Sequence, residues 1–86
     1  MSTVTNMHRI LRLLNMFRSA GGGPLSSLAI WQELTLPGQP QMTKGDFDTA
    51  FRELEDGGLI IGITPQIGHA LYAISDRGAI IAADHR

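Results

Sequence analysis

The fold is decided where a helix leads into a strand, in the stretch Phe51-Arg52-Glu53-Leu54-Glu55-Asp56-Gly57-Gly58-Leu59-Ile60. Phe51 and Leu54 lie three residues apart, which is the apolar spacing of one helix face. The two glycines then end the helix, because glycine loses much backbone entropy in a helix and readily takes the positive φ of a C-cap. The aliphatic residues that follow predict a strand. The stretch therefore predicts a helix that runs directly into a β-strand.

This helix is predicted to begin at Thr43. Thr43 and Asp46 have the spacing of a capping box, in which the threonine hydroxyl accepts a hydrogen bond from an N–H three residues on. Four apolar residues then recur at helical spacing and form the predicted inward face: Phe47, Ala50, Phe51 and Leu54. We therefore expect a helix over about residues 43–56, the third along the chain.

Two short strands and a last helix are expected after the glycine pair. Residues 59–63 and 70–74 are rich in isoleucine and leucine and are bounded by glycine and proline, which predicts a β-hairpin over about 59–74. Ser75 is placed as the N-cap of a helix over about 76–84. Its predicted core residues are Ala79, Ile80 and Ala83.

The N-terminal stretch predicts a first helix over about residues 5–19. Its main face consists of Met7, Ile10, Leu11, Leu14 and Phe17, which recur at steps of three and four. A second apolar stripe comprises Leu13, Met16 and Ala20. Either the helix is central and buried on two sides, or the stripe packs against a second subunit. The second interpretation predicts a homodimer with these three residues at its interface.

A second helix is expected over about residues 25–34. Three glycines end the first helix, and Pro24 suits a first helical position. The candidate inward residues are Leu28, Ala29, Trp31 and Leu34. Two prolines and a glycine within residues 36–41 then predict a turn before the third helix.

The composition fits one small α+β domain over residues 1–86. The chain has 86 residues, of which 43% are hydrophobic, and a formal net charge of −1. It has no cysteine, which excludes disulfides and sulfur-ligated zinc and favours a reducing, cytoplasmic location. No apolar stretch approaches the ~20 residues of a membrane span. The histidines are scattered and Ser26-Ser27 has no local base, so we expect no enzyme, no metal site and no cofactor.

The order of these elements resembles that of a known family. The resemblance is carried by Arg9-Ile10-Leu11-Arg12-Leu13-Leu14, by the stretch from Phe51 to Ile60, and by Ile74-Ser75-Asp76-Arg77-Gly78. The chain resembles a winged helix-turn-helix domain of the multiple-antibiotic-resistance-type repressors and, more closely, small winged-helix proteins of Mu-like phages and prophages. The resemblance implies a three-helix core, a two-stranded wing and a short C-terminal helix. It also implies that the third helix binds double-stranded DNA in a transcriptional regulator.

Charge is distributed unevenly along the chain. Residues 1–32 contain three arginines and no acidic residue, whereas residues 33–86 contain four basic and eight acidic residues. The predicted DNA-binding helix therefore lies in the acidic part of the chain. Since each phosphate of DNA is negative, every uncompensated acidic side chain at the interface opposes binding.

A DNA interface requires that acidic side chains such as Glu53 and Glu55 point away from the duplex. The residues expected to face DNA on the third helix are Thr43, Lys44, Asp48, Thr49 and Arg52. In the wing they are Gln66 and His69. In the first helix, Arg9, Arg12 and Arg18 would contact phosphates.

An interaction module is the alternative to DNA binding. In that case the acidic third helix and the wing would bind a basic protein partner, as in a phage adaptor or inhibitor.

Overall fold

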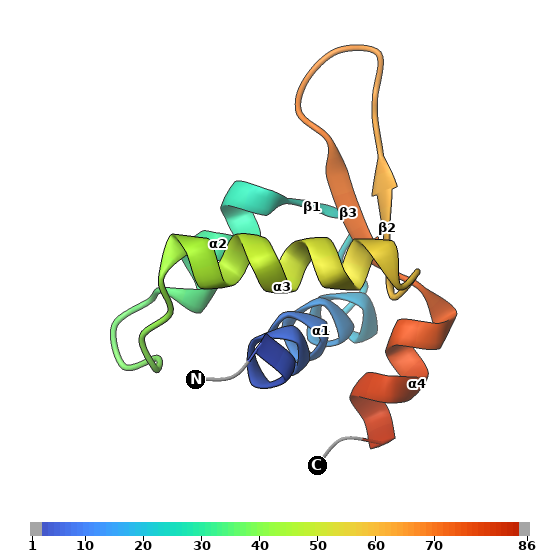
Figure 1. The fold of residues 1–86 in the computed structure, drawn as a ribbon. Coiled ribbons are helices and arrows are strands. Elements are labelled where there is room, and N and C mark those ends of the chain that lie inside the picture. The colour runs from blue at the N-terminus through green and yellow to red at the C-terminus, as the bar shows by residue number, and fades with distance from the viewer. Residues whose placement is uncertain (1–2, 85–86) are drawn as a thin grey trace.

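The structure, a computed structural model, describes residues 3–84 and has a small α+β fold. Within this range the chain forms four helices and a three-stranded antiparallel sheet. The elements follow in the order α1 (Thr3–Ser19), β1 (Leu25–Ser26), α2 (Ser27–Leu34), α3 (Lys44–Asp56), β2 (Ile60–Ile63), β3 (Leu71–Ile74) and α4 (Asp76–Asp84). In Figure 1, α3 crosses in front of α1, and the β2–β3 hairpin projects away from the helices.

The core lies between α1 and α3 and is closed by residues from the other elements. Phe47, Ala50, Phe51 and Leu54 are all buried, which confirms the predicted inward face of α3. Ile10, Leu11 and Leu14 of α1 are also buried, whereas Met7 and Phe17 are only partly covered. The remaining members of the core are Ile30, Leu34, Met42, Ile60, Ile74 and Ala82.

The prediction of a helix from residue 25 was wrong at its start. Leu25 and Ser26 form β1, which pairs antiparallel with Tyr72 and Leu71 of β3. Helix α2 begins only at Ser27 because Ser26 is its N-cap, with its hydroxyl accepting a hydrogen bond from the N–H of Ala29. Pro24 therefore precedes a strand and is not a first helical residue.

The later start also changes which face of α2 is buried. Leu28, predicted to point inward, is 61% exposed, whereas Ile30 is completely buried. Leu34 is buried as predicted, and Ala29 and Trp31 are partly covered. The ring of Trp31 packs edge-on against that of Phe47, with the ring centroids 5.3 Å apart.

Strands β2 and β3 form the predicted antiparallel hairpin, with Ile60 opposite Ile74 and Ile63 opposite Leu71. Strand β3 is central in the sheet, so β2 and β1 are both edge strands. Residues 64–70 connect β2 to β3 and form the projecting end of the hairpin (Figure 1).

Hydrogen bonds of Ser75 and a close contact of Gly78 fix the conformation of the chain where β3 leads into α4. Ser75 is the predicted N-cap: its hydroxyl accepts a hydrogen bond from the N–H of Gly78 and donates one to the carbonyl of Gly58. A Cβ atom on Gly78 would overlap the carbonyl oxygen of Leu59, so this glycine allows α4 to lie directly against the start of β2. This close contact fixes the rotation of the helix.

That rotation contradicts the predicted core face of α4. Gly78 and Ala82 are the buried residues, and Ala79 is partly covered. Ile80 is 64% exposed and Ala83 is exposed, so both were wrongly assigned to the core. The glycine faces inward because only a residue without a side chain fits against Leu59.

Candidate nucleic-acid interface

Helix α3 is held at its N-terminus by Thr43. The threonine hydroxyl accepts a hydrogen bond from the N–H of Asp46 at 3.1 Å, and the Thr43 carbonyl accepts one from the N–H of Phe47 at 3.0 Å. The cap satisfies an N–H group that otherwise has no partner within the helix. Thr43 thus has a structural role at the position where the sequence predicted a DNA contact.

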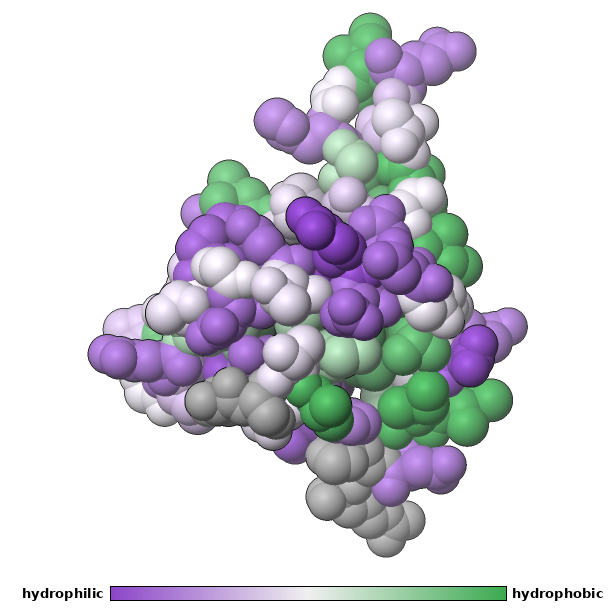
Figure 2. Space-filling model, viewed as in Figure 1, coloured by the Kyte–Doolittle hydropathy of each residue, from purple (hydrophilic) through white to green (hydrophobic). Residues whose placement is uncertain are grey.

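The outermost side chains of α3 lie opposite its buried face. At about 100° per residue, these positions are Gly45, Thr49, Arg52 and Asp56, and all four are exposed. Thr49 and Arg52, both predicted as contact residues, are therefore presented together to solvent. Hydrophilic and neutral residues lie over this face of the molecule in Figure 2.

Lys44 and Asp48 lie on one flank of this face and neutralise each other. The Lys44 ammonium is 2.8 Å from Asp48 Oδ1, four residues further along the helix. It also lies 4.9 Å from the ring centroid of Phe47 and 5.6 Å from that of Trp31, within the range of cation–π attraction. Both partners of the ion pair are more than half exposed, so the pair contributes at most about 1 kcal/mol and breaks easily.

Arg52 borders a shallow depression of about 300 Å³ between α3, the start of α2 and β3. Its walls include Ser27, Asp48, Glu55 and Tyr72. The ring of Tyr72 packs edge-on against Phe51, with centroids 4.6 Å apart, which fixes the ring beside α3. The sequence gives no signal that Ser27 and Tyr72 lie beside Arg52, because this position depends on the pairing of β1 with β3.

The acidic side chains of α3 are concentrated at its C-terminal end. Residues 44–52 contain Lys44, Asp46, Asp48 and Arg52, which sum to no net charge. The last turn contains Glu53, Glu55 and Asp56 without a basic residue. Within the described part of the chain, the ion pairs involve none of these three carboxylates. The electrostatic objection to DNA binding therefore applies mainly to one end of the helix.

The hairpin loop presents Gln66 and His69, and both are exposed. They lie beyond the last strand pair, Ile63 with Leu71, and so at the projecting end of the hairpin. The loop that carries them projects away from the helices (Figure 1).

The arginines of α1 occupy a different place. Arg9 and Arg12 line a groove of about 490 Å³ formed by α1, the end of α2 and residues 36–40. None of its lining residues comes from α3 or the hairpin. Arg9 donates a hydrogen bond to the Leu34 carbonyl at 3.2 Å, where a positive charge suits the C-terminal end of α2. The structure therefore does not bring Arg9 and Arg12 together with Thr49 and Arg52.

Two of the predicted dimer residues lie in that same groove. Leu13 is partly buried against the core, and Met16 is 68% exposed. Ala20 is exposed just beyond the end of α1. The stripe thus divides into one residue that supports the core and two that are accessible.

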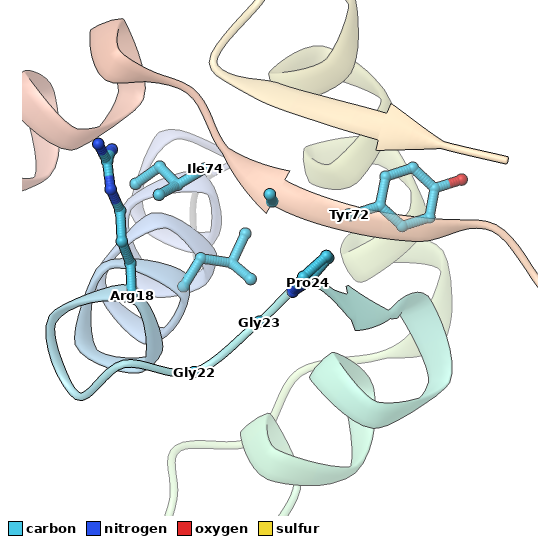
Figure 3. Close-up of a pocket in the computed structure, with 8 residues that line it drawn as sticks. Arg18, Gly22, Gly23, Pro24, Tyr72 and Ile74 are labelled. Carbon is cyan, nitrogen blue, oxygen red and sulfur yellow. The ribbon is translucent and has the colours of Figure 1, made fainter. Parts of the chain in front are cut away.

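A smaller pocket of about 180 Å³ lies between the end of α1, Gly22–Pro24 and β3. Figure 3 shows Arg18 extending along one side of it toward α4 and the hydroxyl of Tyr72 pointing away. Arg18 forms an ion pair with Asp76 at 3.0 Å, so the only charged residue of this pocket already has a partner. The pocket offers a ligand little beyond apolar surface.

Residues 3–84 contain no cluster of three or more histidine or acidic side chains that could hold a metal ion. Across the same residues, no helix combines the length and apolarity required to cross a bilayer.

Asn6 is a buried polar residue of α1 that the sequence did not indicate. It is 1% exposed, and its side-chain oxygen has no hydrogen-bond partner. It occupies a helix position that apolar spacing assigns to the core, but its polar side chain gave no such signal.

No family model, curated protein or solved structure matches this chain. The likeness to winged-helix proteins therefore rests on its sequence motifs and on the order of its elements.

Proposed function

We propose that this chain is a winged helix-turn-helix protein that binds double-stranded DNA, as a transcriptional regulator of a phage or a bacterium. In this proposal α3 enters the major groove and the β2–β3 hairpin is the wing. The observation that supports it best is the exposed face of α3, with Thr49 and Arg52 at its outermost positions, beside a hairpin that projects from the sheet. A recognition helix and an adjoining wing require this juxtaposition.

The charge distribution within α3 is compatible with this role. Recognition helices of this class contact base edges mainly with their N-terminal residues. Residues 44–52 have no net charge, although the first two turns alone, with Lys44 against Asp46 and Asp48, carry one net negative charge. The Lys44–Asp48 pair is exposed enough to open when Lys44 meets a phosphate. Glu53, Glu55 and Asp56 would lie toward the end of the helix that enters the groove less deeply.

Arg52 would supply the main positive contact of α3. An arginine can donate two hydrogen bonds to a guanine or bind a phosphate, and Thr49 one turn earlier can contact a base edge or the backbone. Gln66 and His69 would contact the minor groove from the wing. Arg9 and Arg12 are not needed for this interface, because they line a separate groove.

The test is fluorescence anisotropy of a labelled duplex of about 30 base pairs, titrated with protein at a series of salt concentrations. If the proposal holds, the logarithm of the affinity falls linearly with the logarithm of salt, by about 0.9 for each phosphate contact. Arg52→Ala should weaken binding by about 10-fold or more. Arg77→Ala is the matched control, since Arg77 is an exposed arginine of α4, and it should bind like the unaltered protein. Absence of binding at the lowest salt would contradict the proposal.

A protein-interaction module is the second candidate, and the last turn of α3 favours it. Glu53, Glu55 and Asp56 stand where the helix dipole disfavours negative charge, and no ion pair within residues 3–84 offsets them. Such a cluster would suit a basic protein surface.

The two candidates predict different results for the triple variant Glu53→Gln, Glu55→Gln, Asp56→Asn. If the chain binds DNA, removing three negative charges should raise its DNA affinity and steepen the salt dependence. If neither the unaltered protein nor this variant binds DNA, the interaction module is favoured.

A homodimer through the exposed part of the α1 stripe is part of the proposal. Met16 and Ala20 would supply its accessible apolar contacts. Sedimentation equilibrium should give twice the monomer mass for the unaltered protein and the monomer mass for Met16→Glu. An unaltered protein that remains monomeric at high concentration would exclude this interface.

A further inference from the structure

The end of the hairpin carries an apolar side chain with almost no contact to the rest of the molecule. Ile67 is 92% exposed, the highest value among the large hydrophobic residues of the described range. Figure 2 shows apolar atoms at the far end of the hairpin with hydrophilic atoms beside them. An isoleucine in this position adds nothing to the core, and its burial in a complex would be among the larger hydrophobic gains open to a single residue.

The chemistry around Ile67 limits what this tip can bind. Between Ile63 and Leu71 the chain contains no aspartate, glutamate, lysine or arginine. A loop without lysine or arginine gains little from phosphates, which are recognised mainly by positive side chains. The same loop has no acidic side chain to oppose entry into a negatively charged groove. The interior of a base stack, in contrast, is apolar and uncharged.

We infer that Ile67 is an apolar wedge that enters the minor groove and inserts between two adjacent base pairs. This inference rests on the proposed DNA binding and specifies how the wing takes part in it. Proteins that bend DNA from the minor groove insert isoleucine, leucine, phenylalanine, methionine or proline in this way. Partial unstacking at the insertion point kinks the duplex toward the major groove, where α3 would lie.

The neighbours of Ile67 fit the same groove. The minor-groove edge of an A·T pair offers only hydrogen-bond acceptors. Gln66 and His69 are exposed on either side of the tip and carry N–H groups that can donate to these acceptors. The wedge and its two neighbours would thus make both apolar and polar contacts with bases, without a charged residue.

A wedge of this kind predicts a preference for particular base steps. Pyrimidine–purine steps such as TA and CA unstack and kink more easily than others. The DNA bound by this protein should therefore contain such a step at the position of the wing. An all-purine strand paired with its all-pyrimidine complement contains no such step and is the natural comparison.

The experiment uses two duplexes of equal length, one with repeated TA steps and one with an all-purine strand. Each carries a donor and an acceptor fluorophore at its two ends, so that anisotropy reports binding and energy transfer reports bending. The unaltered protein should bind the TA duplex about 10-fold more tightly and raise its energy transfer. Ile67→Ala should lose this preference and the bend, and Ile80→Ala, which removes an equally large exposed side chain from α4, should keep both.

The possible failures can be told apart. If the unaltered protein binds without bending either duplex, or if Ile67→Ala bends the TA duplex like the unaltered protein, the wedge is wrong while DNA binding stands. If the unaltered protein binds neither duplex at low salt, the proposed function and the wedge are both wrong. Far-UV circular dichroism of Ile67→Ala should match that of the unaltered protein, so that a lost bend is not a lost fold.

Discussion

The junction between β3 and α4 and the loop between β2 and β3 are the two most different parts of this molecule. At the junction, Ser75 and Gly78 are buried, hydrogen-bonded to each other and packed against Leu59. In the loop, Ile67 is almost fully exposed and its neighbours Gln66 and His69 point into solvent. Both segments connect secondary-structure elements, yet only the first is fixed by its surroundings.

This difference separates residues that maintain the fold from residues that are free to bind a partner. Where several contacts determine one conformation, a substitution changes stability first. Where the backbone is exposed and the contacts are few, a side chain can change with little cost to the fold, and such loops often carry function. Substitutions in the two segments should therefore differ most in the measured free energy of unfolding.

The largest effect is expected for Gly78→Ala. The added Cβ would overlap the Leu59 carbonyl and lie 2.9 Å from Ile74 Cγ1, so α4 would have to move away from the start of β2. We expect a loss of about 3 kcal/mol, which urea denaturation followed by circular dichroism can measure.

Gly45→Ala is the matched control for this variant. Gly45 is also a helical glycine, but a Cβ at this position would meet nothing within 4 Å. Alanine should therefore raise stability by about 0.5–1 kcal/mol, through its better helix propensity. Equal losses for both variants would show that the contact of Gly78 with Leu59 is not what distinguishes them.

A smaller loss is expected for Ser75→Ala. The substitution removes the cap of α4 and leaves the Gly58 carbonyl without the hydrogen bond that it now accepts at 2.8 Å. Since Ser75 is buried, we expect a loss of about 2 kcal/mol in urea denaturation. Thr43→Ala removes the corresponding cap of α3 at an exposed position and should cost only about 1 kcal/mol.

Features set by neighbouring residues were predictable from the sequence. The cap at Thr43, the inward face of α3 and the cap at Ser75 each follow from residues within a few positions of one another. The hairpin followed from two aliphatic runs with a proline-containing loop between them. Local hydrogen bonds and apolar periodicity decide these features, and both are visible along the chain.

Features set by distant residues were not predictable. Leu25 and Ser26 form a strand because they meet Tyr72 and Leu71, more than 40 residues further along. Ile80 lies outside because Gly78 must face Leu59. The separation of Arg9 and Arg12 from the outer face of α3 likewise depends on how α1 packs beneath α3. The sequence therefore indicated which predicted contact residues share the exposed face of α3, but not that Arg9 and Arg12 line a separate groove.

Within the hairpin loop, Gly68 is the position where a substitution should cost stability. Its φ is +106°, a conformation that residues with a Cβ rarely adopt, although a Cβ there would meet nothing within 4 Å. Gly68→Ala should therefore cost about 1 kcal/mol through backbone strain alone, measured by urea denaturation. No loss would mean that the loop is free to rearrange at this position.

The smallest effect on stability is expected for Ile67→Ala, the neighbour of Gly68. Ile67 is 92% exposed, so truncating it removes almost no buried surface, and the free energy of unfolding should change by less than about 0.5 kcal/mol. Urea denaturation of Gly68→Ala and Ile67→Ala under the same conditions compares backbone and side chain at adjacent positions. A loss above about 1 kcal/mol for Ile67→Ala would mean that its side chain is buried in the free protein. The contrast between the junction and the loop would then fail, because the tip of the hairpin would be part of the packed structure and could not serve as a wedge.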